Sequence, residues 1–503
     1  MNALIFAFLL FADAPATAPA SLPASMPATA PPLPPASAPP ASPRPAASPS
    51  LLPRYGVETY DVSQTPWGPG RKSSGEAFRS AATLLPEGPL RLRGETWSLA
   101  FGVQLFARAE LRDNNDLRTS AYDLAPLLDH RARVSVRASA FDRVGILLEL
   151  QDVRGWGTER TTVVTEPFTG LHQGFLDVHA AKWLDLRVGR QELCYGEDRL
   201  LGCLDWAQSG RAYDGLFARL SQGMLTVDLF GFYVKSVQRL TRTLPDGTTQ
   251  PLLNTGSYLY GAYARLRPAF PVGFDLYALA YTDDPTSVDI GQRGSNHTVS
   301  IGSRITGKVR GFSATAEGVF QTGRFERVPI AAGGFAVRAS YTAPIFGAPY
   351  ALAEVVGASG DPDPNDGVHR QFNQLFPTGH AHLGYIDYVA WSNVVDTHVA
   401  LGWKPLGVHL WADYHHFRFW DPRGRWLSAT GALFIDADPT RTASVMGDEL
   451  DVSLTVPLTP NVAISTALGL FFPGPGAQAA PGSTIGRGQS TSTWGFVYVR
   501  SQL

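Results

Sequence analysis

The chain has 503 residues, 44% of them hydrophobic, and a formal net charge of −2 at pH 7. This balance argues against the basic surface of a nucleic-acid-binding protein, so we expect no nucleic-acid partner. Only 17% of the residues are charged, against about 25% in ordinary soluble domains, which indicates a surface that partly avoids water. No run of about 18 apolar residues occurs, which excludes helical membrane spans and leaves strands as the only way across a membrane.

The N-terminal part indicates export. Residues 1–14, MNALIFAFLLFADA, are apolar and end in an A-x-A pattern, as a secretory signal peptide does. No Lys or Arg precedes the apolar core, and a short apolar tail is the alternative. Residues 15–53 are almost entirely Ala, Pro and Ser and predict a disordered, partly polyproline linker. A ligand for a proline-binding or peptidoglycan-associated partner is the alternative for this linker, and residues 54–94 are expected to be a periplasmic segment.

From residue 95 to residue 503 the dominant pattern is alternation of polar and apolar residues in segments as long as tilted membrane strands. The clearest is HRARVSVRASA at 130–140, where Arg131, Arg133 and Arg137 share one face and Ala and Val residues share the other. The predicted strands lie at 95–111, 130–140, 143–153, 172–180, 183–191, 211–220, 223–234, 257–268, 272–282, 297–307, 309–321, 333–343, 349–357, 394–404, 406–418, 448–457, 461–472 and 491–501.

The connections between these segments alternate in length. Tight turns such as FDR at 141–143 are followed by long polar stretches such as 154–171 and 358–393. Short turns on one side and long loops on the other are typical of outer-membrane barrels, and an even strand number leaves both termini in the periplasm. The sequence therefore predicts an all-β fold, a transmembrane antiparallel up-and-down barrel of about 18 strands in a Gram-negative outer membrane. A soluble propeller or sandwich is the alternative.

Aromatic residues are expected to form an interfacial girdle on the outer face of this barrel. They gather toward the segment ends in LTVDLFGFYV at 225–234, YLYGAYARL at 258–266 and FDLYALAY at 274–281. Aromatic side chains at the headgroup level are typical of membrane barrels, so these segments support a membrane-facing surface.

Three stretches carry a resemblance to a known family. The first is VGRQELCYGEDRLLGCLDWAQSGRAYDGLFARL at 188–220, which contains the series G-R-Q, Y-G-x-x-R, W and G-R-x-x-D-G. The others are LFPTGHAHLGYIDYVAWSN at 375–393 and GDELDVSLTVPLTPNVAISTALGLFFPG at 447–474. With these stretches in this order, most of residues 90–503 resembles the alginate-export family of outer-membrane barrels.

The resemblance implies a monomeric eighteen-stranded barrel that passes an anionic polysaccharide such as alginate outward through a charged lumen. The expected partners are outer-membrane lipid, that polysaccharide and proteins of a periplasmic export complex, and no cofactor is expected. Two alternatives use the same barrel: a general or small-anion porin, and a plugged barrel with an anchoring or adhesion role. Because no G-x-S-x-G nucleophile elbow is present, we predict no enzyme activity.

A channel for a polyuronate needs fixed cations that replace hydration without trapping the chain, and arginine pairs well with carboxylates. On the strand faces that alternation assigns to the lumen, the expected cations are Arg108, Arg131, Arg133, Arg137, Arg187, Arg211, Arg219, Arg265, Arg267, Arg304, Arg338 and Lys404. The acids on the same faces are Glu110, Glu149, Asp177, Asp228, Glu317, Glu354, Asp396, Asp413, Glu449 and Asp451. This near balance leaves two interpretations. Either the acids hold particular arginines in a local positive ring that includes Arg131, Arg133 and Arg137, or the pore is mixed and weakly selective.

The stretch GRQELCYGEDRLLG at 189–202 leaves the fifth predicted strand with charged residues among glycines. We predict a loop-borne constriction built from Arg190, Arg199, Arg211, Glu197, Asp198 and Asp214. A network that only fixes the loop is the alternative, as an ion pair without a transport role is for any single arginine. The residues expected to line or constrict the pore are Arg131, Arg133, Arg137, Arg187, Arg190, Arg199, Arg211, Asp214, Arg265 and Arg304.

Cys194 and Cys203 are the only cysteines and lie in the same predicted loop. In an oxidising compartment they predict a disulfide, with reduced thiols as the alternative. Two patterns resemble metal sites without matching them. GDPDPNDG at 360–367 departs from the spacing of a calcium loop, and the His380 and His382 pair has no nearby Cys or acidic residue in sequence. We therefore predict no metal ligand.

Overall fold

The computed structural model describes residues 91–502, with gaps at 116, 118–123, 142, 158–167, 236–238, 244–248, 254–255, 269–270, 284–287, 290–291, 294, 460 and 478–489. The predicted signal peptide at 1–14, the linker at 15–53 and nearly all of the segment at 54–94 lie outside the described residues. Among the described residues, no helix has both the length and the apolar character needed to span a membrane.

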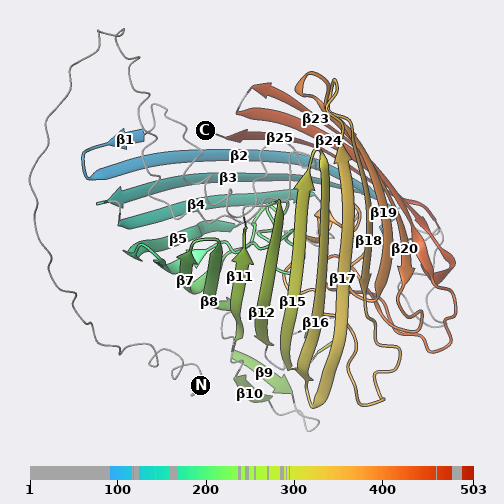
Figure 1. The fold of residues 1–503 in the computed structure, drawn as a ribbon. Helices are drawn as coiled ribbons and strands as arrows, with labels where there is room; N and C mark the ends of the chain where they lie inside the picture. Colours follow the sequence, from blue (N-terminus) through green and yellow to red (C-terminus); the bar gives the residue numbers. More distant parts are fainter. Residues whose placement is uncertain are drawn as a thin grey trace, which may run out of the picture. The chain divides into compact units, whose positions relative to one another are not determined.

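Eighteen antiparallel strands form a closed barrel (Figure 1). Each strand pairs with its neighbours in chain order, and β2 pairs with both β3 and β25, which closes the wall. The barrel strands are β2 (Trp97–Asp113), β3 (Ala125–Ala140), β4 (Val144–Gly157), β5 (Phe168–Ala181), β6 (Leu184–Gln191), β7 (Tyr213–Gln222), β8 (Leu225–Lys235), β11 (Ser257–Leu266), β12 (Val272–Asp283), β15 (Asn296–Val309), β16 (Phe312–Phe325), β17 (Val328–Thr342), β18 (Tyr350–Ala358), β19 (Val394–Trp403), β20 (His409–Phe419), β23 (Val445–Thr459), β24 (Val462–Pro473) and β25 (Ser492–Gln502).

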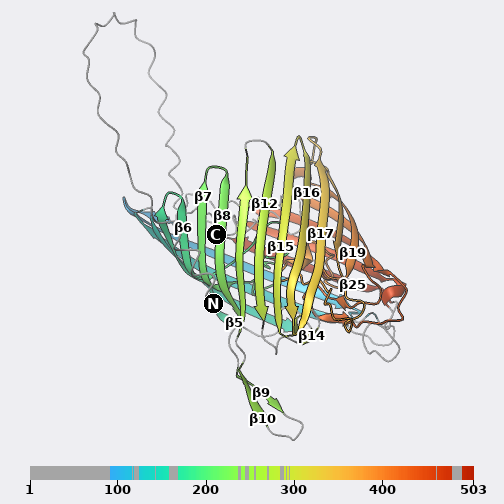
Figure 2. The ribbon, with the colours of Figure 1, turned by 60° about the horizontal axis from the view of Figure 1, so that its bottom comes forward.

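Each of the strands predicted from alternation overlaps one strand of the barrel, which confirms the fold. The remaining strands are short: β1 (Arg91–Arg93) pairs with the start of β2, and three small hairpins lie in loops. These hairpins are β9 (Arg239–Thr243) with β10 (Thr249–Leu253), β13 (Val288–Asp289) with β14 (Gln292–Arg293), and β21 (Trp426–Leu427) with β22 (Leu433–Ile435). Figure 2 shows the β9–β10 hairpin reaching beyond the rim of the barrel. Three 3-10 turns, η3 (Gly379–Ala381), η4 (Pro405–Gly407) and η5 (Pro475–Ala477), complete the elements.

The two faces of the wall are reversed relative to a soluble sandwich. On β3 the side chains of Arg131, Arg133 and Arg137 are buried, whereas Val134 on the other face is 52% exposed. Leu216 and Leu401 are likewise 64% and 67% exposed on the outer face. A charged interior and an apolar exterior are favourable only when the exterior contacts lipid, so alternation here places the polar face in the lumen.

Aromatic side chains occur on both faces. Trp97, Trp156, Trp183, Trp403 and Trp420 are exposed at the outer ends of strands or in turns, as a membrane girdle requires. The segments predicted to supply that girdle point many of their rings the other way. Phe230, Phe232, Tyr263, Tyr277 and Tyr281 are buried on the lumen face. The prediction was wrong for these five rings because each lies an even number of residues from a buried charged residue of its own strand, Asp228, Arg265 or Asp275, and so shares its lumen face.

Two long connections fold into the lumen instead of standing above it. We call residues 192–212, between β6 and β7, the first inserted segment, and residues 359–393, between β18 and β19, the second. Tyr195 of the first stacks on Tyr263 with ring centroids 4.2 Å apart. In the second, Asn373 accepts a bond from Gln321 of β16 at 2.6 Å. The two segments also join each other, since Gly202 donates its backbone N–H to the Phe376 carbonyl at 2.8 Å.

Candidate functional site

The lumen-facing arginines of β3 and β6 share one carboxylate. Asp177 on β5 accepts a bond from Arg137 Nη2 at 3.1 Å and another from Arg187 Nε at 2.5 Å. The Arg187 guanidinium also lies 4.1 Å from the centroid of the Phe175 ring, at a cation–π distance. Because one carboxylate balances only one guanidinium, this group keeps a positive charge.

The same arrangement recurs around Asp228. Arg219 of β7 donates to both oxygens of this β8 carboxylate at 2.6 Å, and Arg265 of β11 donates to one of them at 2.7 Å. Tyr195 of the first inserted segment adds a hydroxyl donor at 2.8 Å. The carboxylate is completely buried, so its charge depends on these donors.

A third group centres on Asp275 of β12. Arg304 of β15 donates to its Oδ2 at 2.7 Å, and Arg267 donates to its Oδ1 at 2.5 Å. The Tyr263 hydroxyl donates to Oδ2 at 2.7 Å. Neighbouring strands therefore present the same motif of one acid between two arginines.

The first inserted segment contributes to a fourth group. Arg338 of β17 donates to Glu354 Oε2 of β18 at 2.9 Å, and Arg199 of the segment donates to Oε1 of the same carboxylate. Glu197 lies 3.4 Å from Arg199 and 3.5 Å from Arg338. Burial alone would raise the pKa of Glu197, but Arg338 and Arg199 lower it below its ordinary value.

A fifth group lies on β2. Glu110 pairs with Arg108 at 3.2 Å and with Arg112 at 2.7 Å. Arg108 also donates to Asp129 of β3 at 3.1 Å, and its guanidinium lies 4.0 Å from the centroid of the Trp206 ring. Arg108 is therefore held both by the wall and by the first inserted segment.

Arg131 holds the backbone of the first inserted segment. Its Nη1 donates to the carbonyls of Asp205, Ala207 and Gln208 at 3.2, 3.1 and 3.3 Å. The Asp205 carboxylate lies 3.0 Å from Arg131 and 3.5 Å from Arg133. Of the stripe Arg131, Arg133 and Arg137, only Arg137 pairs with the wall carboxylate Asp177, whereas the other two hold a loop.

These groups explain the near balance of lumen charges. Asp177, Asp228 and Asp275 each lie between two arginines, which gives these three groups a local excess of guanidinium. Glu110 shares its two arginines with Asp129, and Glu354 shares its two with Glu197, so those two groups are balanced. Further acids lie on strands later in the chain. Asp396, Asp413, Glu449 and Asp451 are buried on the lumen face of β19, β20 and β23. On the described residues of these strands and β24, no Lys or Arg faces the lumen.

The charged residues predicted as one constriction separate into three places. Arg190 and Asp214 pair at 2.6 Å with side chains 35% and 53% exposed. Arg190 and Asp214 are register partners, and the next pair along the two strands, Gln191 and Tyr213, is buried in the lumen. Because successive residues of a strand point to opposite faces, Arg190 and Asp214 lie on the outer face. Arg199 and Glu197 belong to the Glu354 group, and Asp198 occupies a turn where its backbone N–H bonds to Tyr195.

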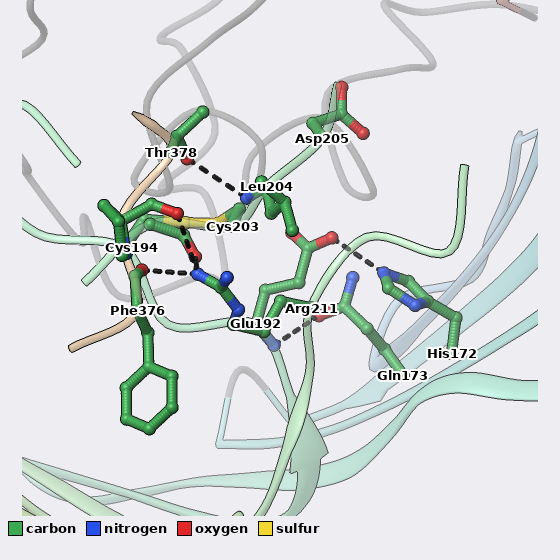
Figure 3. The surroundings of a disulfide bond; sticks show 12 residues. His172, Gln173, Glu192, Cys194, Cys203, Leu204, Asp205, Arg211, Phe376 and Thr378 are labelled. Carbon is green, nitrogen blue, oxygen red and sulfur yellow. Dashed lines mark hydrogen bonds and ion pairs between the residues drawn. A yellow bond between two sulfur atoms is a disulfide. The ribbon is translucent and has the colours of Figure 1, made fainter. Parts of the chain in front are cut away.

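Arg211 joins the two inserted segments near the disulfide (Figure 3). Its Nη1 donates to the carbonyls of Gly202 at 3.0 Å, Pro377 at 3.1 Å and Phe376. Cys194 and Cys203 form a disulfide with Cα atoms 5.3 Å apart, a usual separation. The bond closes a loop within the first inserted segment, next to Gly202, whose carbonyl Arg211 binds.

His380 and His382 of the second inserted segment are packed in the lumen. His380 stacks on Trp206 with ring centroids 4.2 Å apart and lies 3.0 Å from Asp387. His382 Nε2 lies 2.6 Å from the Glu197 carbonyl. Burial lowers the pKa of His380, and burial together with Arg199 and Arg338 holds the pKa of His382 well below its ordinary value. Both imidazoles are therefore neutral at neutral pH.

Sequence reasoning missed several residues of the lumen. Asp129 and Asp275 share the inward parity of their strands and could have been found by it. His398 and His415 were missed as well, and with Asp413, which was predicted to face the lumen, they bring one potential ligand atom each within 4.8 Å of one another. Their common face was visible from alternation, but the pairing of β19 with β20 was needed to place the two histidines together.

The comparisons with known proteins agree with this architecture. A family model described as Alginate export matches residues 97–489, and no curated protein matches the chain. Among solved structures, Pseudomonas aeruginosa OccK2 (OpdF) in complex with glucuronate is 10% identical, with a TM-score of 0.52 over 80% of this chain and 96% of that chain. Acinetobacter baumannii OccAB4 is 11% identical, with a TM-score of 0.51 over 83% of this chain and 100% of that chain. At such identity the likeness shows the barrel fold alone.

Proposed function

Because this chain belongs to the alginate-export family, we propose that its outer-membrane barrel passes an anionic polysaccharide such as alginate out of the cell. The chain is an outer-membrane channel of porin-type fold. Alginate or a similar polyuronate is the proposed cargo, the monomer is the proposed state, and both termini are proposed to lie in the periplasm, at the rim with the short turns. Proteins of a periplasmic export complex are the proposed source of the polymer.

The observation that carries the proposal is the local excess of arginine in the three lumen groups around Asp177, Asp228 and Asp275. A polyuronate has one carboxylate per sugar, and each shared acid of these groups leaves guanidinium charge to attract it. The acids also fix the arginines in position, so that no side-chain entropy is lost when a sugar carboxylate approaches. Repeated weak sites at fixed spacing allow a chain to enter and leave, which transport requires.

The inserted segments must move for a polymer to reach these arginines. The side chain of Arg137 is 7% exposed, and those of Arg219 and Arg304 are 4% and 3% exposed. Such small exposures leave no room for a sugar carboxylate beside the guanidinium. We therefore assign the two inserted segments the role of a gate, closed in this conformation.

Single channels in a planar bilayer test the proposal. We expect a polyuronate to reduce the current reversibly, from the side on which it is added, while a neutral dextran of equal hydrodynamic radius leaves the current unchanged. Monomeric uronate distinguishes polysaccharide export from the alternative, a small-anion porin. If the monomer blocks as well as the polymer at equal carboxylate concentration, the protein is a small-anion porin. A barrel that conducts no ions under any condition would instead have an anchoring role.

A further inference from the structure

Two histidines and an aspartate meet on the lumen face of β19 and β20. His398 and His415 are direct partners across the two strands, with ring centroids 4.0 Å apart. Asp413 lies two residues before His415 on the same face, and its Oδ1 is 2.7 Å from His398 Nε2. All three side chains are nearly fully buried, and one ligand atom of each lies within 4.8 Å of the others.

A second layer of carboxylates holds the two rings. His415 Nδ1 lies 2.9 Å from Asp396 Oδ2, and His398 Nδ1 lies 3.5 Å from Glu354 Oε2. Metal-binding histidines commonly donate their other ring N–H to a carboxylate, which fixes the tautomer and leaves the remaining nitrogen free to coordinate. With both Nδ1 atoms engaged in this way, Nε2 is the nitrogen left on each ring for a metal, and that of His398 lies at a bonding distance from Asp413, the third proposed ligand.

The charges around this cluster call for a cation. Asp413 is the register partner of Asp451, and His415 is the register partner of Glu449. Carboxylates directly opposite each other repel, and within the described bounds of β19, β20, β23 and β24 no arginine or lysine faces the lumen. Asp396 Oδ1, Glu449 Oε2 and Asp451 Oδ1 are buried and accept no hydrogen bond among the described residues.

From this geometry we propose a binding site for a divalent transition-metal ion of the zinc type, with His398 Nε2, His415 Nε2 and the Asp413 carboxylate as its ligands. Two imidazoles and one carboxylate are a common ligand set for zinc, and imidazole nitrogen disfavours calcium and magnesium. A bound dication would offset the negative charge of Asp413 and Asp451, so its role is to stabilise the acidic wall. The site is independent of what the channel carries.

Cobalt and zinc binding to the full-length protein, purified without a polyhistidine tag, tests the site. We expect one equivalent of Co²⁺ to bind with visible d–d absorption and to be displaced by one equivalent of Zn²⁺. His398→Gln and His415→Gln should each weaken binding by more than tenfold, and Asp396→Asn should weaken it about tenfold, the effect typical of a second-layer carboxylate. Heat-modifiable migration in gels verifies that each variant is a folded barrel.

His416→Gln is the matched control, because His416 neighbours His415 in sequence but lies on the outer face, where it bonds to Asp448 at 2.8 Å. This variant should keep the affinity and the spectrum of the parent. The proposal is overturned if the folded parent binds no stoichiometric Co²⁺ or Zn²⁺. It is equally overturned if binding survives in both His398→Gln and His415→Gln or is lost in His416→Gln.

Discussion

Arg137 and Arg187 lie on different strands and donate to opposite oxygens of one carboxylate, that of Asp177. Neither arginine can swing away, because each is tied to the same buried acid. The pattern of one acid between two arginines recurs at Asp228 and Asp275 and gives these parts of the lumen fixed positive charge. It also explains how a chain with nearly equal numbers of acids and bases builds an anion-attracting surface.

Replacing Arg137 and Arg187 together by Gln should lower anion preference. The change removes two positive charges and leaves Asp177 with amide donors only, so the reversal potential under a salt gradient should move toward the cation side. Arg190→Gln is the matched control, since Arg190 lies on the same strand as Arg187 but on the outer face. An unchanged reversal potential in the double variant would show that this pair is structural only.

Arg211→Met should open the gate. The variant removes the Arg211 donor from the carbonyls of Gly202 and Pro377 and leaves the Phe376 carbonyl with the Gly202 N–H alone. Leaving a buried acceptor unsatisfied costs about 1–3 kcal/mol, so the two inserted segments should separate more often. We expect a higher open probability in single-channel records, and Arg211→Lys, which keeps a donor, should lie between the parent and Arg211→Met. Equal open probabilities in all three proteins would exclude this contact as part of the gate.

The Cys194–Cys203 disulfide should protect the first inserted segment from proteolysis. Disulfides contribute typically about 2–4 kcal/mol by restricting the open chain, so the pair of Cys→Ser changes should let the segment leave the lumen more easily. Trypsin should then cleave at Arg199, which is buried in the closed conformation, faster than in the parent. Mass spectrometry of the fragments identifies the site. Cleavage at equal rates with and without the disulfide would mean that packing alone holds the segment.

Acid should also release the second inserted segment. Burial lowers the pKa of His380 in the packed state, whereas in the released segment the pKa returns to its ordinary value of 6.5. Below pH 6.5 the released segment therefore binds more protons than the packed one. The free energy of docking is therefore fully present above pH 6.5 and declines as the pH falls. We expect conductance to rise below that pH in the parent.

The paired variant His380→Phe, His382→Gln keeps the stack on Trp206 and the donor to Glu197 but removes both titrating groups. Its conductance should depend less on pH. His297→Phe changes an exposed histidine of the outer face and should behave like the parent. If the paired variant retains the full acid response, other groups control it.

Alternation predicted the barrel strands and the inward face of residues such as Glu354 and Asp396, because a period of two fixes which side chains share a face. Alternation also indicated that Arg190 does not line the lumen. Arg190 is three residues from Arg187 on one strand and must point the other way. The partners were not predictable. Arg199 and Glu354 are 155 residues apart, and their contact depends on a loop folding back into the lumen. Local pattern carries no information about such a return, nor about which strand faces which across the barrel.

The most direct measurement of the central claim is transport of the polymer itself. Proteoliposomes loaded with a fluorescent polyuronate should release it when they contain the parent barrel, and release it more slowly with the Arg137→Gln, Arg187→Gln variant. A labelled neutral dextran of equal size should stay inside in both cases. Retention of the polyuronate by vesicles whose barrels conduct ions normally would contradict polysaccharide export.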